Sequence, residues 1–188
     1  NISKTQYGIY SQGASIASKN TGNIITQNLM NTTSPNHIAK GGIWTGFEDN
    51  IQVTNNNIDG VTQTSSPDVF GIALGLTGLS TTSFTGNEVT NATVTGNFIG
   101  KVTNTGTFSA AGITVASATS GTTLIANNSI YGVGANGTGG DYGAGIFLGG
   151  GVGSTTNVYY NSISMTGTFT GGSYPNFGLA IGGTDPTV

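Results

Sequence analysis

The chain has 188 residues, among them 33 Gly, 31 Thr and 20 Asn, and its formal net charge is −3. It contains no Cys and no Arg, and only four Lys. Disulfide scaffolds, thiolate metal sites and thiol nucleophiles are therefore excluded. Nucleic acid is a poor partner, because neutralising phosphates requires Lys and Arg. Since Gly, Asn and Thr are weak helix formers, the composition also disfavours a helical fold.

Short runs of alternating apolar and polar residues, such as Ile51–Val53 and Ile113–Val115, indicate β-strands rather than a flexible low-complexity chain. Hydrophobic residues make up 35% of the chain, which is enough to supply strands with a buried face. No apolar run approaches the roughly 18–20 residues of a membrane helix. We therefore expect no membrane insertion.

A Gly-Ile pair recurs at intervals of 29 to 41 residues and divides the chain into repeats. We expect each pair to lie on a strand. The Ile and the second residue after it would face inward, and the residue between them outward. The pairs begin at Gly8, Gly42, Gly71, Gly112, Gly145 and, as Gly-Leu, Gly178. The expected inward residues are Ile9, Ser11, Ile43, Thr45, Ile72, Leu74, Ile113, Val115, Ile146, Leu148, Leu179 and Ile181.

Between successive pairs lies a second element, in which an Asn follows one apolar residue by three positions and precedes another by two. A straight strand would send these two apolar residues to opposite faces, so we predict a bend at the Asn. Asn suits such a bend because it tolerates left-handed backbone angles. Asn side chains one strand spacing apart can also form a hydrogen-bonded ladder. The predicted ladder consists of Asn28, Asn56, Asn97, Asn128 and Asn161.

Several short strands in each repeat, with one stacked Asn bend, predict a coil of parallel strands in which each repeat forms one rung. The pattern resembles the right-handed parallel β-helix of pectate-lyase-like proteins, in which an Asn ladder lies at a tight turn. We therefore expect an all-β, right-handed parallel β-helix (solenoid) of about five to six rungs. It would span 1–188 as a single segment of a longer repeat protein. A β-propeller is the alternative, but its blades of 40–45 residues are longer than most of these spacings.

A narrower resemblance concerns the segments 156–163 and 186–188, which read Thr-Asn-Val-Tyr-Tyr-Asn-Ser-Ile and Pro-Thr-Val. They resemble the degenerate repeats of large secreted surface proteins of Bacteroidota that use type IX secretion. This resemblance implies that the protein is secreted or lies on the cell surface.

The seven acidic residues do not predict an active site. Lyases of the pectate-lyase-like family pair Ca²⁺-binding Asp clusters with a basic residue, typically Arg, and this chain has no Arg. Glycosidases need two carboxylates on one face. Glu48 and Asp49 would point apart in a strand, and Asp68 and Asp141 are expected two rungs, roughly 10 Å, apart. We predict no catalytic residue, no metal and no cofactor, and we interpret the acids as turn residues or caps and His37 as a surface residue.

Two further patterns are too rare to define a site. The sequence Gly-Gly-Asp-Tyr-Gly at 139–143 is similar to Ca²⁺-binding nonapeptide repeats, but it occurs once and such sites need stacked copies. Thr62 and Thr103 follow their Asn bends at equal offsets, each with a second Thr two positions later. We expect them on rungs that are not adjacent, so they do not predict a regular ice-binding array.

The outward position of the Gly-Ile strand carries an aromatic residue in three rungs, at Tyr10, Trp44 and Phe147. We call these residues the aromatic strip, and we expect Tyr10 and Trp44 to stack. Exposed aromatic rings form platforms for sugars and also anchor protein interfaces. The strip is thus a candidate ligand-binding surface, and the alternative is that inserted loops fold over it.

We expect a non-enzymatic structural or adhesive segment of a secreted or cell-surface protein, such as a stalk, an adhesin or a filament or matrix component. Strands at the two ends of a stack have unpaired edges. We therefore expect end-to-end self-association, or pairing with neighbouring repeats of the same chain. Surface glycans are a further candidate partner. The alternative function is a carbohydrate-binding or polysaccharide-degrading β-helix domain, that is, a lyase or glycosidase.

Overall fold

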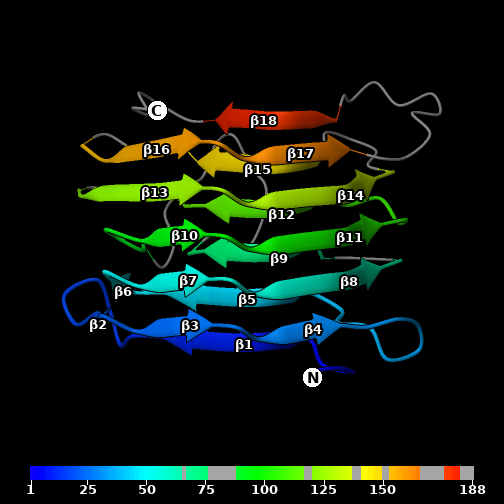
Figure 1. The fold of residues 1–188 in the computed structure, drawn as a ribbon, viewed down its shortest axis with the longest axis horizontal. Helices are drawn as coiled ribbons and strands as arrows, with labels where there is room; N and C mark the ends of the chain where they lie inside the picture. The colour runs from blue at the N-terminus through cyan, green and yellow to red at the C-terminus, as the bar shows by residue number, and fades with distance from the viewer. Residues whose placement is uncertain are drawn as a thin grey trace.

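The computed structural model describes residues 1–64, 67–75, 88–116, 120–136, 141–149, 153–165 and 176–182. In these ranges the chain cycles through three parallel sheets of six, five and five strands, which confirms the predicted all-β solenoid of about five to six rungs. Figure 1 shows the two five-stranded sheets side by side in front of the six-stranded sheet. The front strands run to the right and the rear strands to the left while the rungs rise from the N- towards the C-terminus, so the coil is right-handed (Figure 1).

The Gly-Ile pairs lie on the six-stranded rear sheet, in which the isoleucines are direct partners in neighbouring strands. Successive repeats therefore stack in register, and neighbouring strands of the rear sheet come from successive repeats. In spatial order the strands are β1 (Tyr7–Gln12), β5 (Gly41–Gly46), β9 (Val69–Leu74), β12 (Ala110–Val115), β15 (Gly143–Gly149) and β18 (Phe177–Gly182).

The two front sheets lie on either side of the Asn bend. The strands before the bend are β3 (Ile24–Thr26), β7 (Gln52–Thr54), β10 (Thr93–Thr95), β13 (Thr122–Ala126) and β16 (Thr155–Tyr159). The strands after it are β4 (Leu29–Asn31), β8 (Asn57–Gln63), β11 (Phe98–Asn104), β14 (Ser129–Ala135) and β17 (Ser162–Met165). A small additional sheet pairs β2 (Asn20–Thr21) with β6 (Glu48–Asp49).

The core is a continuous column of aliphatic side chains inside the coil. Ile43, Ile72 and Ile113 of the rear sheet are fully buried, and they belong to one cluster with the inward residues of both front sheets. Burying a side chain of this size contributes roughly 1.5–3 kcal/mol. Leu179 and Ile181 align with the buried Ile146 and Leu148, as expected for inward residues, but they are 42% and 50% exposed. They lie on β18, the last strand of the rear sheet, which among the described strands pairs with β15 alone.

Close stacking explains why the residue before each Ile is Gly. A β-carbon on Gly112 would lie 2.5 Å from the carbonyl oxygen of Gly145 and 2.7 Å from Cγ2 of Ile130. The corresponding clash with the next Gly of the column recurs at Gly8, Gly42, Gly71 and Gly145. Gly178, in the last rung, would meet nothing closer than 4.0 Å. The Gly column is therefore a packing requirement of stacked rungs rather than of a single strand.

The left-handed residue of the Asn bend is not the ladder Asn, so that part of the prediction is wrong. Instead, the residue immediately before each ladder Asn is left-handed, with φ between 55° and 68°. The chain thus turns one position earlier than expected. The ladder Asn can then direct both its main-chain N–H and its side chain along the stack. The five left-handed residues are Gln27, Asn55, Gly96, Asn127 and Tyr160.

Candidate functional site

The Asn ladder is the most regular polar feature of the described chain, and it forms as predicted. The main-chain N and Nδ2 of Asn97 both donate to Oδ1 of Asn128, each at 3.0 Å. Nδ2 of Asn97 also donates to the carbonyl oxygen of Val53 in the preceding rung at 2.8 Å. The same donation to the next rung joins Asn28, Asn56, Asn97, Asn128 and Asn161 into one chain of side chains.

The middle of this ladder is buried, since Asn56, Asn97 and Asn128 are only 1–2% exposed. A buried amide that loses its partners costs about 1–3 kcal/mol, so the ladder satisfies groups that the bend would otherwise leave unpaired. Its role is structural, because each amide is occupied by its neighbours in the stack.

The aromatic strip is only partly accessible. The rings of Tyr10 and Trp44 stack as predicted, with centroids 4.5 Å apart and planes 14° apart. Tyr10 is 55% exposed, but Trp44 and Phe147 are 1% exposed each. They belong to a second apolar cluster on the outer side of the rear sheet, together with Phe70 and Ala111. The strip therefore does not form a continuous exposed platform.

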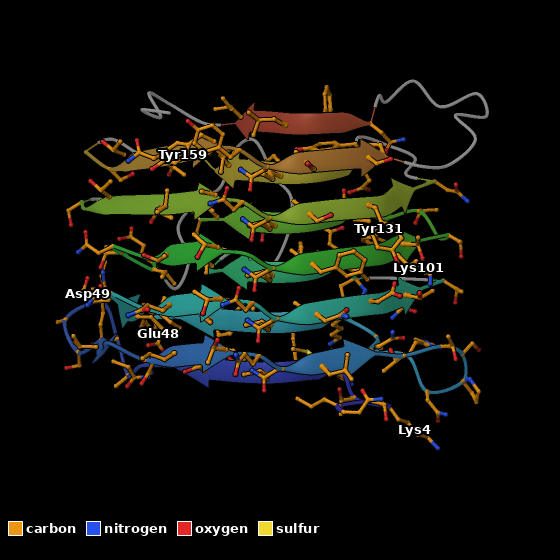
Figure 2. All side chains as sticks on the ribbon, viewed as in Figure 1. Lys4, Glu48, Asp49, Lys101, Tyr131 and Tyr159 are labelled. Atoms are coloured by element: carbon orange, nitrogen blue, oxygen red, sulfur yellow. The ribbon has the colours of Figure 1, made fainter. Side chains whose placement is uncertain are left out.

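Glu48 and Asp49 point to different partners, as expected for neighbours in a strand. Glu48 is fully buried, and its carboxylate accepts hydrogen bonds from the side chains of Ser11, Asn20 and Asn23 at 2.6–3.0 Å. Asp49 accepts hydrogen bonds from the side chains of Thr90 and Asn91 at 2.7 and 2.9 Å. These two bonds hold the pKa of Asp49 below its ordinary value, with a smaller contribution from the charge of Lys19. Figure 2 shows both acids at the left-hand side of the coil, where β6 lies.

Asp68 and Asp141 are connected by the residue between them in the stack. Asp68 Oδ1 accepts a hydrogen bond from the main-chain N of Ser109 at 2.8 Å, and Asp141 Oδ1 accepts one from the Ser109 hydroxyl at 3.0 Å. Ser109 also accepts a hydrogen bond from the main-chain N of Tyr142. Burial, together with the charges of the two acids, raises the pKa of Tyr142 to about 12. Asp68, Ser109 and Asp141 thus link successive rungs by hydrogen bonds, which is consistent with the interpretation of the acids as turn residues or caps.

Sequence reasoning missed one cluster, on the outer face of the sheet that contains β8, β11 and β14. Lys101 Nζ forms an ion pair with Asp59 Oδ2 at 3.1 Å, and the Phe98 and Tyr131 rings lie beside it with centroids 5.1 Å apart. The hydrogen bond and charge of Asp59 raise the pKa of Lys101. Burial, followed by the hydrogen bond and charge of Asp59, raises the pKa of Tyr131. We call Asp59, Phe98, Lys101 and Tyr131 the β11 cluster.

Three smaller expectations can be compared with the structure. Thr62 and Thr103 do lie on adjacent rungs, with hydroxyls 3.3 Å apart, so their expected separation is wrong. His37, interpreted from the sequence as a surface residue, lies in the segment that connects β4 to β5 and is half-buried. Of the segment 139–143, which is similar to Ca²⁺-binding repeats, Asp141 belongs to the described chain, but Gly139 and Gly140 lie outside it.

Two further findings concern the described residues. No helix among them is long and apolar enough to cross a membrane. The same residues contain no group of three or more His, Cys, Asp or Glu side chains arranged to hold a metal ion.

The three sheets and the ladder place the chain among parallel β-helix, or β-solenoid, proteins. In comparisons with known proteins, no family model, no curated protein and no solved structure matches it.

Proposed function

We propose that this chain is a rigid, non-enzymatic spacer in a secreted or cell-surface β-solenoid protein, where it serves as a stalk, adhesin or filament segment. The observation that carries the proposal is the continuity of the Asn ladder and the aliphatic core through successive rungs. Such a stack behaves as a one-dimensional rod whose neighbouring rungs stabilise each other. Its defining property is then its length and stiffness.

The acidic side chains support a non-enzymatic role. Glu48, Asp49, Asp68 and Asp141 accept hydrogen bonds from groups of neighbouring rungs. A general acid or base must instead reach a substrate atom at hydrogen-bond distance. The location and the likeness to repeats of type IX-secreted proteins of Bacteroidota form part of this proposal and rest on the sequence pattern alone.

The proposal is tested by segment replacement in the organism that makes the protein. One strain carries an unrelated β-solenoid with the same number of rungs in place of 1–188, and a second carries a Gly/Ser linker of equal residue count. We expect the solenoid strain to keep the adhesion or surface phenotype of the parent protein and the linker strain to lose it, because a flexible chain cannot hold a fixed distance. Immunoblotting of surface fractions controls for export.

Two results would contradict a spacer role. One is loss of the phenotype in the solenoid strain at normal surface levels, which would show that particular side chains of this segment are needed. The other is turnover of pectin, polygalacturonate or neutral polysaccharides by the purified chain, followed by reducing-end release.

A further inference from the structure

Two aromatic rings and an ion pair meet on the outer face of β11 and its neighbours. Phe98 is 39% exposed, and its ring is tilted by 42° against the Tyr131 ring. The Lys101 side chain is 60% exposed, whereas that of its partner Asp59 is 10% exposed. Figure 2 shows Tyr131 and Lys101 close together at one end of this front sheet. The β11 cluster therefore offers solvent an apolar surface beside a charged donor, the Lys101 ammonium, which the buried Asp59 carboxylate holds in place.

The backbone beneath the cluster carries a glycine, Gly100, which leaves room for the Tyr131 ring. Gly100 pairs directly with Asp59 on one side and with Tyr131 on the other. A β-carbon on Gly100 would collide with the Tyr131 ring, so the absence of a side chain there lets the ring lie across the strand towards Asp59. The β11 cluster thus combines side chains of three adjacent rungs, and it forms only when these rungs are in register.

Lys101 occupies a backbone position that favours glycine. Its φ is 49°, and the residues at the same position of the neighbouring strands, Gly60 and Gly132, have φ of 96° and 66°. A long side chain in the left-handed region is disfavoured, whereas Gly is accommodated there without strain. A backbone outlier of this kind is a reason to consider a function for the side chain.

We propose that the β11 cluster binds a neutral saccharide unit. A sugar ring has an apolar C–H face, which fits an exposed aromatic surface, and a rim of hydroxyls, which can accept hydrogen bonds from the exposed Lys101 ammonium. The ion pair is balanced in charge and the chain carries a net charge of −3, which disfavours polyuronates. This inference goes beyond the spacer role, since a spacer with this site would also engage a glycan along its side.

The test is affinity electrophoresis of the purified chain through gels that contain barley β-glucan, xyloglucan or galactomannan, with polygalacturonate as the acidic arm. A neutral polysaccharide that retards the chain is then followed with its hexasaccharide by calorimetry. We expect Phe98→Ala and Tyr131→Ala to weaken binding by roughly tenfold each, as expected for loss of an aromatic contact. Tyr159→Ala removes an exposed tyrosine of the other front sheet and is the matched control, with unchanged binding expected.

Lys101→Gly separates a binding role from a structural one. The Gly variant is free of left-handed strain, so the fold should persist and the circular dichroism spectrum should stay unchanged. If Lys101 served the fold alone, affinity for the saccharide would then also stay unchanged. We expect instead a several-fold loss of affinity. The proposal is overturned if no neutral polysaccharide retards the wild-type chain, if only polygalacturonate does, or if Phe98→Ala and Tyr131→Ala bind like the wild type. None of these outcomes affects the spacer proposal, which the segment replacement tests separately.

Discussion

At the scale of single residues, the Asn bend divides two tasks between neighbours. The residue before the ladder Asn adopts the left-handed conformation, and the ladder Asn makes the hydrogen bonds. The first task depends on the backbone and tolerates several residue types, but Gly performs it without steric cost. The second task needs an amide, which offers a donor and an acceptor on one short side chain.

This division predicts opposite effects of Gly at the two positions. Gln27→Gly should raise the free energy of unfolding by about 1 kcal/mol, because Gln27 is exposed and left-handed at φ 56°. Asn56→Gly should lower it by about 2–3 kcal/mol, because two half-buried donors of Asn28 lose their acceptor and the buried carbonyl oxygen of Ile25 loses a donor. Urea unfolding followed by circular dichroism measures both. A loss of stability in Gln27→Gly with none in Asn56→Gly would contradict the assignment.

Asp49 predicts a specific acid sensitivity. Its pKa is lowered in the folded protein from the ordinary 3.8, so its ionised form stabilises the fold above pH 3.8. This contribution is lost as the pH falls through the lower folded pKa. Thermal melts between about pH 5 and pH 2.5 should therefore show wild type and Asp49→Asn converging in stability at the acid end. A stability difference that stays constant over this range would be inconsistent with the lowered pKa.

At the scale of strands, the Gly column controls how closely rungs approach. We expect Gly112→Ala to lower the free energy of unfolding by about 3 kcal/mol, because its β-carbon would meet both a backbone oxygen and a core side chain. Gly178→Ala is the control in the same column, and it should change stability by less than about 0.5 kcal/mol, because its nearest neighbour lies 4.0 Å away. Equal losses in both variants would show that the clash is not the cause. Denaturant unfolding of both variants under one set of conditions makes the comparison.

Repeated residue types decided which features of the fold were predictable. Identical Asn and Gly residues recur in columns, so their spacing identified the rungs and the ladder. The left-handed position was missed because its five occupants share no chemistry, being Gln, Asn, Gly, Asn and Tyr. The β11 cluster was missed because Asp59, Lys101 and Tyr131 meet only when three rungs are in register. Burial of Trp44 could not be derived either, because an outward position in a strand does not say what covers it.

At the scale of the whole molecule, the outer edge of β18 has no partner strand in the described part of the chain, and this edge predicts association. Leu179 and Ile181 are exposed on this strand, and an apolar edge strand is a template for another chain. We expect the isolated chain to form concentration-dependent end-to-end assemblies by light scattering. Replacing both residues by Lys should shift the assemblies towards monomer, since edge charges oppose pairing. A wild-type monomer whose mass does not change on dilution would contradict this prediction.

The direction of the Asn ladder restricts how any such assembly can grow. Each rung donates, through its main-chain N–H and its amide, to the oxygen of the rung on its C-terminal side. A rung added beyond Asn161 would have to offer an acceptor, and a rung added before Asn28 would have to offer donors. Two like ends would bring donor against donor or acceptor against acceptor. A filament of such units is therefore polar, with two chemically different tips, and it can extend by head-to-tail addition alone.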